Sequence, residues 1–446
     1  MPFFRKRHRP RVLVIGLDGV PYSFLKKHME SGDLPNLAQI AEGGTFRRIN
    51  SVYPTVSSVA WASYMTGKNP AGHGIFGFID RRPNPFKLFI PNARNLRAKA
   101  LWEVLGEHGE KVVVINVPVT YPPSPVNGIL IGGFLGADVN KIGYPPEVNS
   151  KLLEMGYRID VDAWKGRQED KGPFLENLHL TLDKRCEVAS HFLRHEDWDF
   201  FQLHIMETDR INHFLWEHYE QDDPRYAPRF LEFYRKLDRW VGKLVDATQK
   251  RDKRTTIVIL SDHGFCSVKK EVYINHWLQD QGYLKFEPRK EKDAITDMSP
   301  ESKAYSLIPG RVFVNLKGRE QMGSVGSGSE YEGLREELSE KLMDLRDPDT
   351  DEPMVKKVYR REELYRGPYL DEAADLIVVP HDGYDLKGNV KAEGLTHKGE
   401  LVGMHTYDDA AVFVWTDDPF EPGDWKWIGD VGLAILAYFD AEGMLQ

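Results

Sequence analysis

The segment Val12-Leu13-Val14-Ile15-Gly16-Leu17-Asp18-Gly19 indicates the fold, because an apolar run rich in β-branched residues ends abruptly in an acid and a glycine. This pattern is typical of a buried strand in a parallel sheet that carries a carboxylate to the edge of the sheet. Open α/β sheets bind ligands at the carboxyl ends of their strands, so Asp18 is a candidate site residue. Taken alone, Asp18 is equally well explained as a helix cap.

Two further apolar runs end in the same manner. Residues 256–260 lead into Ser261-Asp262-His263-Gly264, and residues 200–206 lead into Glu207-Thr208-Asp209, with His213 four positions beyond Asp209. The i, i+4 spacing of Asp209 and His213 would place both on one helical face or in one tight loop. Three strand ends that carry carboxylates and imidazoles predict one shared site.

The residue types at these strand ends predict a metal centre. Carboxylates and imidazoles without thiolates suit zinc, manganese or iron. Two metal ions would polarise a phosphoryl group and stabilise the leaving oxygen. The candidate site residues are Asp18, Ser57, Asp209, His213, Asp262, His263 and His405.

Ser57 and Ser58 stand at the start of a predicted helix that Gly67 closes. A serine at this position is most often an N-cap. A helix N-terminus also receives phosphate, so the same hydroxyl is a candidate nucleophile. The neighbouring metal-type ligands favour the nucleophile. His73, alone in a turn-rich loop, is predicted to be structural.

Strands and helices alternate over most of the chain, which predicts the α/β class with a central mostly parallel sheet flanked by helices. Residues 1–10 are expected to form a basic tail, and residues 11–446 a single catalytic domain. The alternation is lost at about 136–172 and 267–330. These two segments are predicted to be insertions that form lids or caps.

The composition excludes several classes. A net charge of −9 over 446 residues argues against a nucleic-acid polymer as partner. The only cysteines, Cys186 and Cys266, suit a reducing compartment, so a cytoplasmic location is expected. Neither a secretory signal nor a transmembrane segment of ~20 apolar residues is predicted. The basic tail is expected to be solvated, with weak contact to an anionic membrane as the alternative.

The motifs together resemble the alkaline phosphatase superfamily, and most closely its type I phosphodiesterase/nucleotide pyrophosphatase branch. They extend over about residues 11–415, in an order and spacing that are specific. The matching motifs are Gly16-Leu17-Asp18-Gly19, Leu34-Pro35-Asn36-Leu37, Tyr53-Pro54-Thr55-Val56-Ser57, Thr66-Gly67, Asp209-xxx-His213, Ser261-Asp262-His263-Gly264 and Gly403-Met404-His405.

The resemblance implies an alkaline-phosphatase-like fold and a metal-dependent phosphodiesterase acting on a small phosphorylated substrate. It implies two divalent metal ions. Zinc is the expected metal, and manganese is the alternative. Ser57 would attack phosphorus and form a covalent phospho-enzyme, with Ser58 as the competing nucleophile. The Ser58 backbone N–H and the Arg210 side chain would contact the substrate. The resemblance places one ion on Asp209, His213 and His405, and the other on Asp18, Ser57, Asp262 and His263.

One position departs from the pattern of the branch. The nucleotide pyrophosphatases that these motifs resemble have an asparagine shortly after a His-Gly-Ile segment. Here residues 73–78 contain none, so nucleotide specificity is not implied. A phosphomonoesterase, a phosphomutase and a non-catalytic binding protein remain alternatives. A monoesterase would need a further cation, which Arg210 offers. A phosphomutase would need a domain inserted after the nucleophile, whereas a strand already returns at Lys111. A sulfatase would need proline and arginine where Val59 and Trp61 stand.

Overall fold

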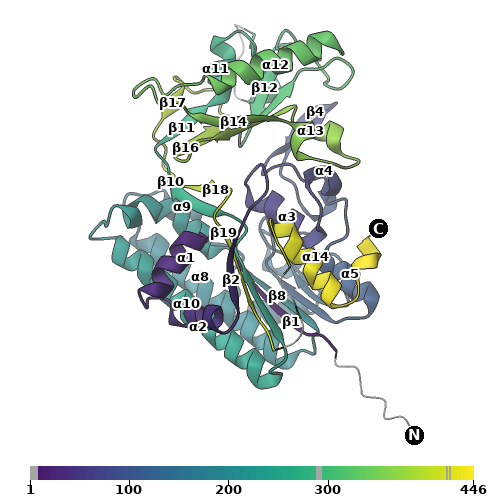
Figure 1. Cartoon of the computed structure of the whole chain (residues 1–446), viewed down its shortest axis with the longest axis vertical. Helices are drawn as coiled ribbons and strands as arrows, with labels where there is room; N and C mark the ends of the chain where they lie inside the picture. Colours follow the sequence, from purple (N-terminus) through teal and green to yellow (C-terminus); the bar gives the residue numbers. More distant parts are fainter. Residues whose placement is uncertain (1–8, 288–293, 418–419, 421–422, 446) are drawn as a thin grey trace.

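The computed structural model describes residues 9–287, 294–417, 420 and 423–445, which form two lobes (Figure 1). The larger lobe is built on an eight-stranded sheet, and the smaller lobe contains shorter sheets. The predicted α/β class with a central mostly parallel sheet flanked by helices is confirmed. The order across the large sheet is β2 (Thr45–Ile49), β19 (Ala410–Trp415), β9 (Thr256–Leu260), β1 (Val12–Leu17), β8 (Phe200–Ile205), β5 (Val112–Ile115), β6 (Gly128–Ile131) and β7 (Gly143–Tyr144).

The strand β1 lies in the middle of this sheet, as its apolar sequence predicts. It pairs in parallel with β8 on one side and β9 on the other, and Gly16 stands opposite both His204 and Leu260. The three strands therefore end at the same edge, where Asp18, Asp209 and Asp262 follow them. The antiparallel strand β19 pairs with β9 and β2.

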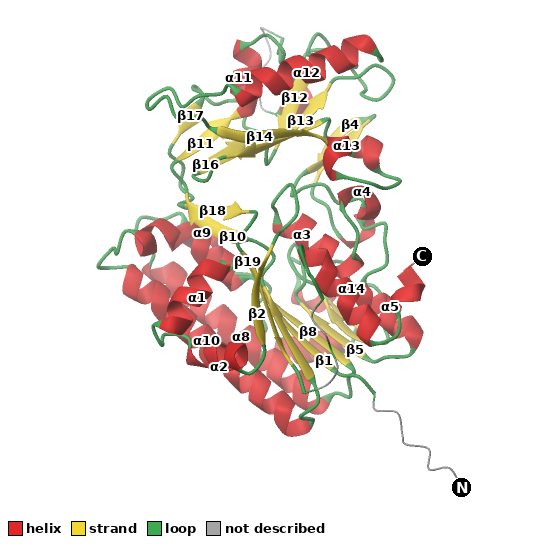
Figure 2. Cartoon of the chain, viewed as in Figure 1, coloured by secondary structure: helices red, strands yellow, loops and turns green. Residues whose placement is uncertain are grey.

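Alternate side chains of β1 enter two separate cores because successive residues of a strand face opposite sides of the sheet. Leu13, Ile15 and Leu17 belong to one core, and Val12 and Val14 to the other. Helices cover both faces (Figure 2). The first core is covered by α1 (Tyr22–Glu30), α2 (Pro35–Glu42), α8 (Gly172–His195), α9 (Glu207–Glu220) and α10 (Ala227–Arg251). The second is covered by α3 (Ser57–Thr66), α5 (Leu101–His108) and α14 (Ile428–Tyr438).

The smaller lobe, which we call the cap, is formed by residues 268–287 and 294–402 together with the hairpin of β3 (Asp80–Pro83) and β4 (Phe86–Phe89). A third core fills it, with Ala71 and Phe76 and with further members from Val272 to Val390. Its elements include β11 (Lys270–Tyr273), α11 (Ile274–Asp280), β12 (Ala304–Leu307), β13 (Arg311–Val314), α12 (Ser329–Met343), β14 (Val355–Arg360), β15 (Leu376–Pro380), β16 (Tyr384–Lys387) and β17 (Thr396–His397).

A two-stranded ribbon joins the cap to the larger lobe. It consists of β10 (Gly264–Ser267), where the chain leaves the larger lobe, and β18 (Gly403–Thr406), where the chain returns. Phe265 stands opposite His405 in this antiparallel pair. The predicted ligands His263 and His405 therefore lie at the two points where the chain crosses between the lobes.

The segment predicted to be an insertion at 136–172 contains β7, the edge strand of the large sheet, and the short helices α6 (Val148–Glu154) and α7 (Ala163–Gly166). A buried arginine of α8 holds it, since Arg185 donates to the Tyr157 hydroxyl at 2.6 Å and to the Ile159 carbonyl at 2.9 Å. Arg185 is paired with Glu207, the first residue of α9. Among the described residues, no helix is both long enough and apolar enough to span a bilayer.

Candidate active site

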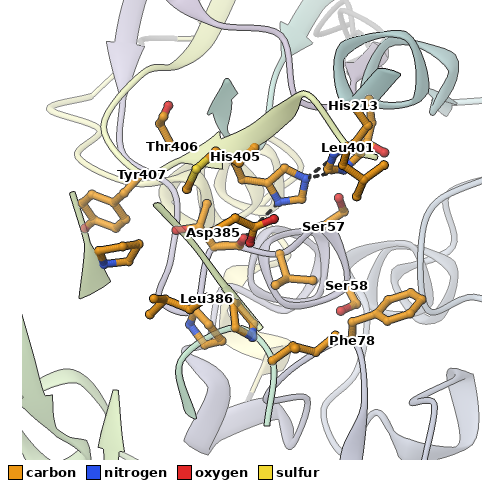
Figure 3. A pocket seen from close by; sticks show the side chains of 18 of the residues that line it. Ser57, Ser58, Phe78, His213, Asp385, Leu386, Leu401, His405, Thr406 and Tyr407 are labelled. Atoms are coloured by element: carbon orange, nitrogen blue, oxygen red, sulfur yellow. Dashed lines mark hydrogen bonds and ion pairs between the residues drawn. The ribbon is translucent and has the colours of Figure 1, made fainter. Parts of the chain in front are cut away.

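A cavity of about 410 Å³ opens between the two lobes at the edge of the sheet where β1, β8 and β9 end. Ser57, His213 and His405 line it on the larger lobe (Figure 3). Asp209 lines it as well. The cap contributes a mainly apolar wall to the same cavity. That wall includes Ile308, Pro309, Ile377, Val378 and Leu386.

Ser57 is the first residue of α3, and its hydroxyl does not cap the helix. It donates to Asp18 Oδ1 at 3.0 Å and lies 3.3 Å from His263 Nε2. The neighbouring Ser58 hydroxyl instead donates to the Gly77 carbonyl at 3.0 Å in the interior. The two candidate nucleophiles are thereby distinguished, because only the Ser57 hydroxyl faces the predicted ligands.

The side chains of Asp209, His213 and His405 form one group. Asp209 and His213 lie on α9, which resolves the predicted choice between a helix and a tight loop in favour of the helix. The Asp209 Oδ1 atom is 3.3 Å from His213 Nε2 and 3.1 Å from His405 Nε2. The two Nε2 atoms are 3.0 Å apart.

The backbone determines which nitrogen of each ring carries the proton. His213 Nδ1 lies 2.9 Å from the Gly403 carbonyl, and His405 Nδ1 lies 3.0 Å from the Thr55 carbonyl. A carbonyl can only accept, so each Nδ1 donates to its carbonyl. The Nε2 atoms are thereby turned towards each other and towards the Asp209 carboxylate.

Asp18, Asp262 and His263 form a second group beside the first. His263 Nε2 is 3.6 Å from Asp18 Oδ1 and 3.4 Å from Asp262 Oδ2. His263 Nδ1 faces the Gly264 carbonyl at 3.1 Å, so its Nε2 is also an acceptor. Asp262 Oδ1 accepts the Gly19 N–H at 3.0 Å, while its buried Oδ2 has no hydrogen-bond partner among the described residues.

Two sets of side chains, which differ from these groups in that His263 replaces His213 in the first, fit a divalent cation because each brings carboxylate oxygens and imidazole nitrogens together. Suitable ligand atoms of Asp209, His263 and His405 lie within 4.8 Å of one another, as do those of Asp18, Asp262 and His263. His263 belongs to both sets, and its ring stacks on His405 with centroids 3.8 Å apart. Every histidine is oriented by a backbone carbonyl, as metal-binding histidines usually are.

The electrostatics of the protein without bound ions agree with this arrangement. Burial and the neighbouring His405 lower the pKa of His263 to about 3, which keeps the imidazole neutral. Burial and the charge of Asp18 raise the pKa of Asp262 well above its usual value. Burial also opposes ionisation of Asp209, but His213 and His405 outweigh it and hold the pKa of Asp209 well below its usual value. A cation at each group would relieve the repulsion between these carboxylates.

Arg210 lines the cavity but is already engaged. Its guanidinium donates to Asp160 at 2.7 Å and 3.2 Å, and to Asp209 Oδ2 at 3.2 Å. Burial opposes its charge, yet these two carboxylates outweigh burial and raise the pKa of Arg210. Arg210 thus links the segment at 136–172 to a predicted metal ligand.

His73 lies outside the site and supports the helix α3, as the sequence predicts. It is buried, its Nδ1 accepts the Ile75 N–H at 3.1 Å, and its Nε2 contacts the Ser63 hydroxyl at 3.0 Å. Phe78 stands in the segment where the resembling branch has an asparagine. It lines the cavity and packs against Phe134 with ring centroids 5.5 Å apart.

Two residues that contact Asp18 were not predicted from the sequence. His204 Nε2 contacts Asp18 Oδ2 at 2.8 Å, and Trp61 Nε1 donates to the same oxygen at 3.0 Å. A histidine inside the apolar run of β8 was the available signal for the first. Trp61 resembles an ordinary core residue, and only Gly16, whose added Cβ would lie 2.5 Å from the indole, hints at its position.

The mixed α/β fold and the two adjoining acceptor groups at the carboxyl edge of the sheet define a member of the alkaline phosphatase superfamily. The chain belongs to the type I phosphodiesterase / nucleotide pyrophosphatase family, whose sequence profile matches residues 12–408. The predicted family is thereby confirmed, and with it the broad class of phosphoester hydrolases.

Solved structures with a similar fold include proteins of two kinds. Phosphonoacetate hydrolase from Sinorhizobium meliloti 1021, in complex with phosphonoformate, aligns with a TM-score of 0.65 at 17% identity, over 98% of this chain and 96% of that chain. Murine ectonucleotide pyrophosphatase / phosphodiesterase 5, in complex with AMP, aligns with a TM-score of 0.58 at 15% identity, over 97% and 95% of the two chains. At these identities the likeness concerns the fold.

Proposed function

We propose that this protein is a metal-dependent phosphodiesterase in which Ser57 is the nucleophile. The observation that carries the proposal is the position of the Ser57 hydroxyl, which lies 3.0 Å from Asp18 Oδ1 and 3.3 Å from His263 Nε2. A serine hydroxyl is a weak nucleophile unless neighbouring groups activate it. At this position the hydroxyl does not cap its helix and instead adjoins Asp18 and His263 of the second group.

The N-terminus of α3 would receive the phosphoryl group. The first N–H groups of a helix have no partner within the helix, and the helix dipole favours negative charge there. The N–H of Ser58 is therefore proposed to contact a phosphoryl oxygen. Ser57 Oγ would form a bond to phosphorus as the bond to the leaving oxygen breaks. Water would then cleave the Ser57 phosphoester and restore the hydroxyl.

The residues of the two groups would hold two divalent ions, zinc first and manganese as the alternative. We assign Asp209, His213 and His405 to one ion, and Asp18, Ser57, Asp262 and His263 to the other. Bound ions would supply the Lewis acidity that polarises the phosphoryl group and lowers the pKa of the Ser57 hydroxyl. The converging Nε2 atoms of His213 and His405 support this assignment, as does Asp262 Oδ2, which has no hydrogen-bond partner in the part of the chain that the structure describes.

The state of Arg210 favours a diester over a monoester. A monoester carries an additional negative charge and is expected to need a further cation. Arg210 is proposed to contact the substrate weakly, because Asp160 and Asp209 already share its charge. Arg167, which also lines the cavity, is paired with Glu400.

Both segments predicted to be insertions border the cavity, and we propose that they select the substrate. Ala163 and Arg167 come from the first segment, and Ile308 and Pro309 from the second. We also propose that the protein works in the cytoplasm, because Cys186 and Cys266 are both free thiols. Thiol titration of protein purified from its natural cells, after rapid alkylation, tests that location.

The test compares hydrolysis of bis-p-nitrophenyl phosphate with that of p-nitrophenyl phosphate. Metal-stripped protein is refilled with zinc or with manganese, and Ser57→Ala is compared with Ser58→Ala. We expect metal to restore diester hydrolysis and Ser57→Ala alone to abolish it. Ser58→Ala removes a neighbouring hydroxyl of the same helix and is the matched control.

Other outcomes would redirect the proposal. A strong preference for the monoester would make the protein a phosphatase and would give Arg210 a larger part in substrate binding. Equal loss in both serine variants would remove the assignment of the nucleophile. A protein that binds two metal ions but hydrolyses neither ester would contradict the proposed reaction.

A further inference from the structure

The two oxygens of the Asp18 carboxylate have different surroundings. Oδ1 faces the site, where it accepts from Ser57 and lies 3.6 Å from His263 Nε2. Oδ2 faces the interior, where it meets His204 Nε2 at 2.8 Å and Trp61 Nε1 at 3.0 Å. Asp18 Oδ2 therefore accepts hydrogen bonds from two donors that do not line the cavity.

The His204 side chain makes no other hydrogen bond among the described residues. Its side chain is fully buried, and the Trp61 ring stands edge-on to it with centroids 4.7 Å apart. Its Nδ1 has no hydrogen-bond partner among the described residues. A buried polar atom without a partner is costly, so an apolar residue would suit this position better if packing were its only role.

The contact with Asp18 defines the proton on His204. An ionised carboxylate only accepts, so Nε2 carries the hydrogen and donates it to Oδ2. The neighbouring strand makes this arrangement rigid, because the register opposes His204 to Gly16, two residues before Asp18. Gly16 in turn leaves the space that the Trp61 indole fills.

We propose that His204 is a positioning residue of the metal centre. By holding Oδ2, it fixes the carboxylate so that Oδ1 points to Ser57 and His263. Its expected effect on turnover rests on the proposed function, whereas its expected effect on metal binding does not. Loss of such an outer partner of a metal ligand typically weakens metal binding by about 10–100-fold.

The test measures zinc affinity and stoichiometry by competition with a chromogenic chelator, together with kcat and KM for bis-p-nitrophenyl phosphate. His204→Leu removes the donor, and His204→Gln places an amide donor at a similar distance along the side chain. Tyr64→Phe is the matched control, because it removes a different buried hydrogen bond between α3 and β8, from Tyr64 to Gln202. Circular dichroism establishes that each variant is folded.

We expect His204→Leu to weaken one zinc equivalent by about 10–100-fold and to lower kcat more than it raises KM. His204→Gln should recover much of both, and Tyr64→Phe should change neither. If His204→Leu does not fold, His204→Asn replaces it, since its shorter amide stops before Oδ2. Two zinc equivalents of unchanged affinity in the folded variant without the donor would overturn the proposal. A wild type that binds two zinc ions without hydrolysing the diester would contradict the proposed function, while the zinc comparison would still test His204.

Discussion

The Nε2 atoms of His213 and His405 lie 3.0 Å apart, and the Nδ1 atom of each ring faces a backbone carbonyl. Both Nε2 atoms are thus turned towards Asp209, whose Oδ1 lies 3.3 Å from that of His213 and 3.1 Å from that of His405. Removing bound metal with a chelator is expected to lower the melting temperature, and added zinc to restore it. A ligand at 1,000 times its Kd stabilises a protein by about 4 kcal/mol.

Differential scanning calorimetry of stripped and refilled protein measures this effect. His213→Ala is the comparison, because it removes one of the two facing nitrogens and should reduce the response to zinc. Equal melting temperatures for the stripped and refilled wild type would contradict a metal site between these rings.

Gly16 gives a second prediction, because the Trp61 indole occupies the space above it. A Cβ at Gly16 would lie 2.5 Å from Cη2 of Trp61. Gly16→Ala is expected to lower the free energy of unfolding by about 1–3 kcal/mol through overpacking. It should also lower diester turnover, since the displaced indole donates to Asp18.

The control for this substitution is Gly333→Ala. Gly333 is exposed inside α12, and nothing beyond its own helical backbone lies within 4 Å of the methyl group that alanine would add. There the substitution should raise the free energy of unfolding by about 0.5–1 kcal/mol, because alanine favours a helix. Urea denaturation of both variants would show opposite signs; the same sign would refute the packing argument.

His73 predicts a dependence of stability on pH. Burial lowers its pKa to about 3, whereas an unfolded histidine titrates near its ordinary value of 6.5. The unfolded state therefore binds one more proton between these values, and the free energy of unfolding falls as the pH falls from 6.5 towards 3. The slope from this residue is about 1.4 kcal/mol per pH unit.

Urea denaturation at several pH values, for the wild type and His73→Asn, isolates this contribution. The variant cannot titrate at this position, so its stability should depend less steeply on pH between about 4 and 6. Parallel pH dependences would show that His73 does not resist protonation in the folded state.

The buried pair of Arg185 and Glu207 gives a fourth prediction. Both side chains are at most 1% exposed, and Arg185 also holds Tyr157 and the Ile159 carbonyl. Arg185→Met leaves the Glu207 charge buried without its partner and should cost about 3–5 kcal/mol. Arg185→Met combined with Glu207→Gln should recover part of this loss. A double variant that is less stable than Arg185→Met would contradict a penalty from the unpaired charge.

The sequence predicts those features of the fold that depend on a single strand or helix. The apolar runs before Asp18, Asp209 and Asp262 predicted three strands, and the structure has them as β1, β8 and β9 in adjacent positions. The helix that begins at Ser57 was also predicted. Gly67 adopts the left-handed conformation that ends this helix, as predicted. These features depend on residues that are neighbours in the chain.

Features that depend on distant residues could not be predicted. The apolar strand β15 pairs with β13 and β14 in the cap instead of joining the large sheet. Its apolar sequence suits either sheet. The contact of His204 with Asp18 spans 186 positions, and no local pattern indicates it.

The ribbon of β10 and β18 ties together the two ends of the 268–402 segment, so that excursion begins and ends at one place. His263 immediately precedes the ribbon, and His405 lies within it. A segment whose two ends meet in this way can be lengthened, shortened or exchanged while His263 and His405 keep their positions. Grafting the corresponding segment of a relative between Ser267 and Gly403 is thus expected to exchange the cap wall of the cavity while the proposed ligands keep their positions.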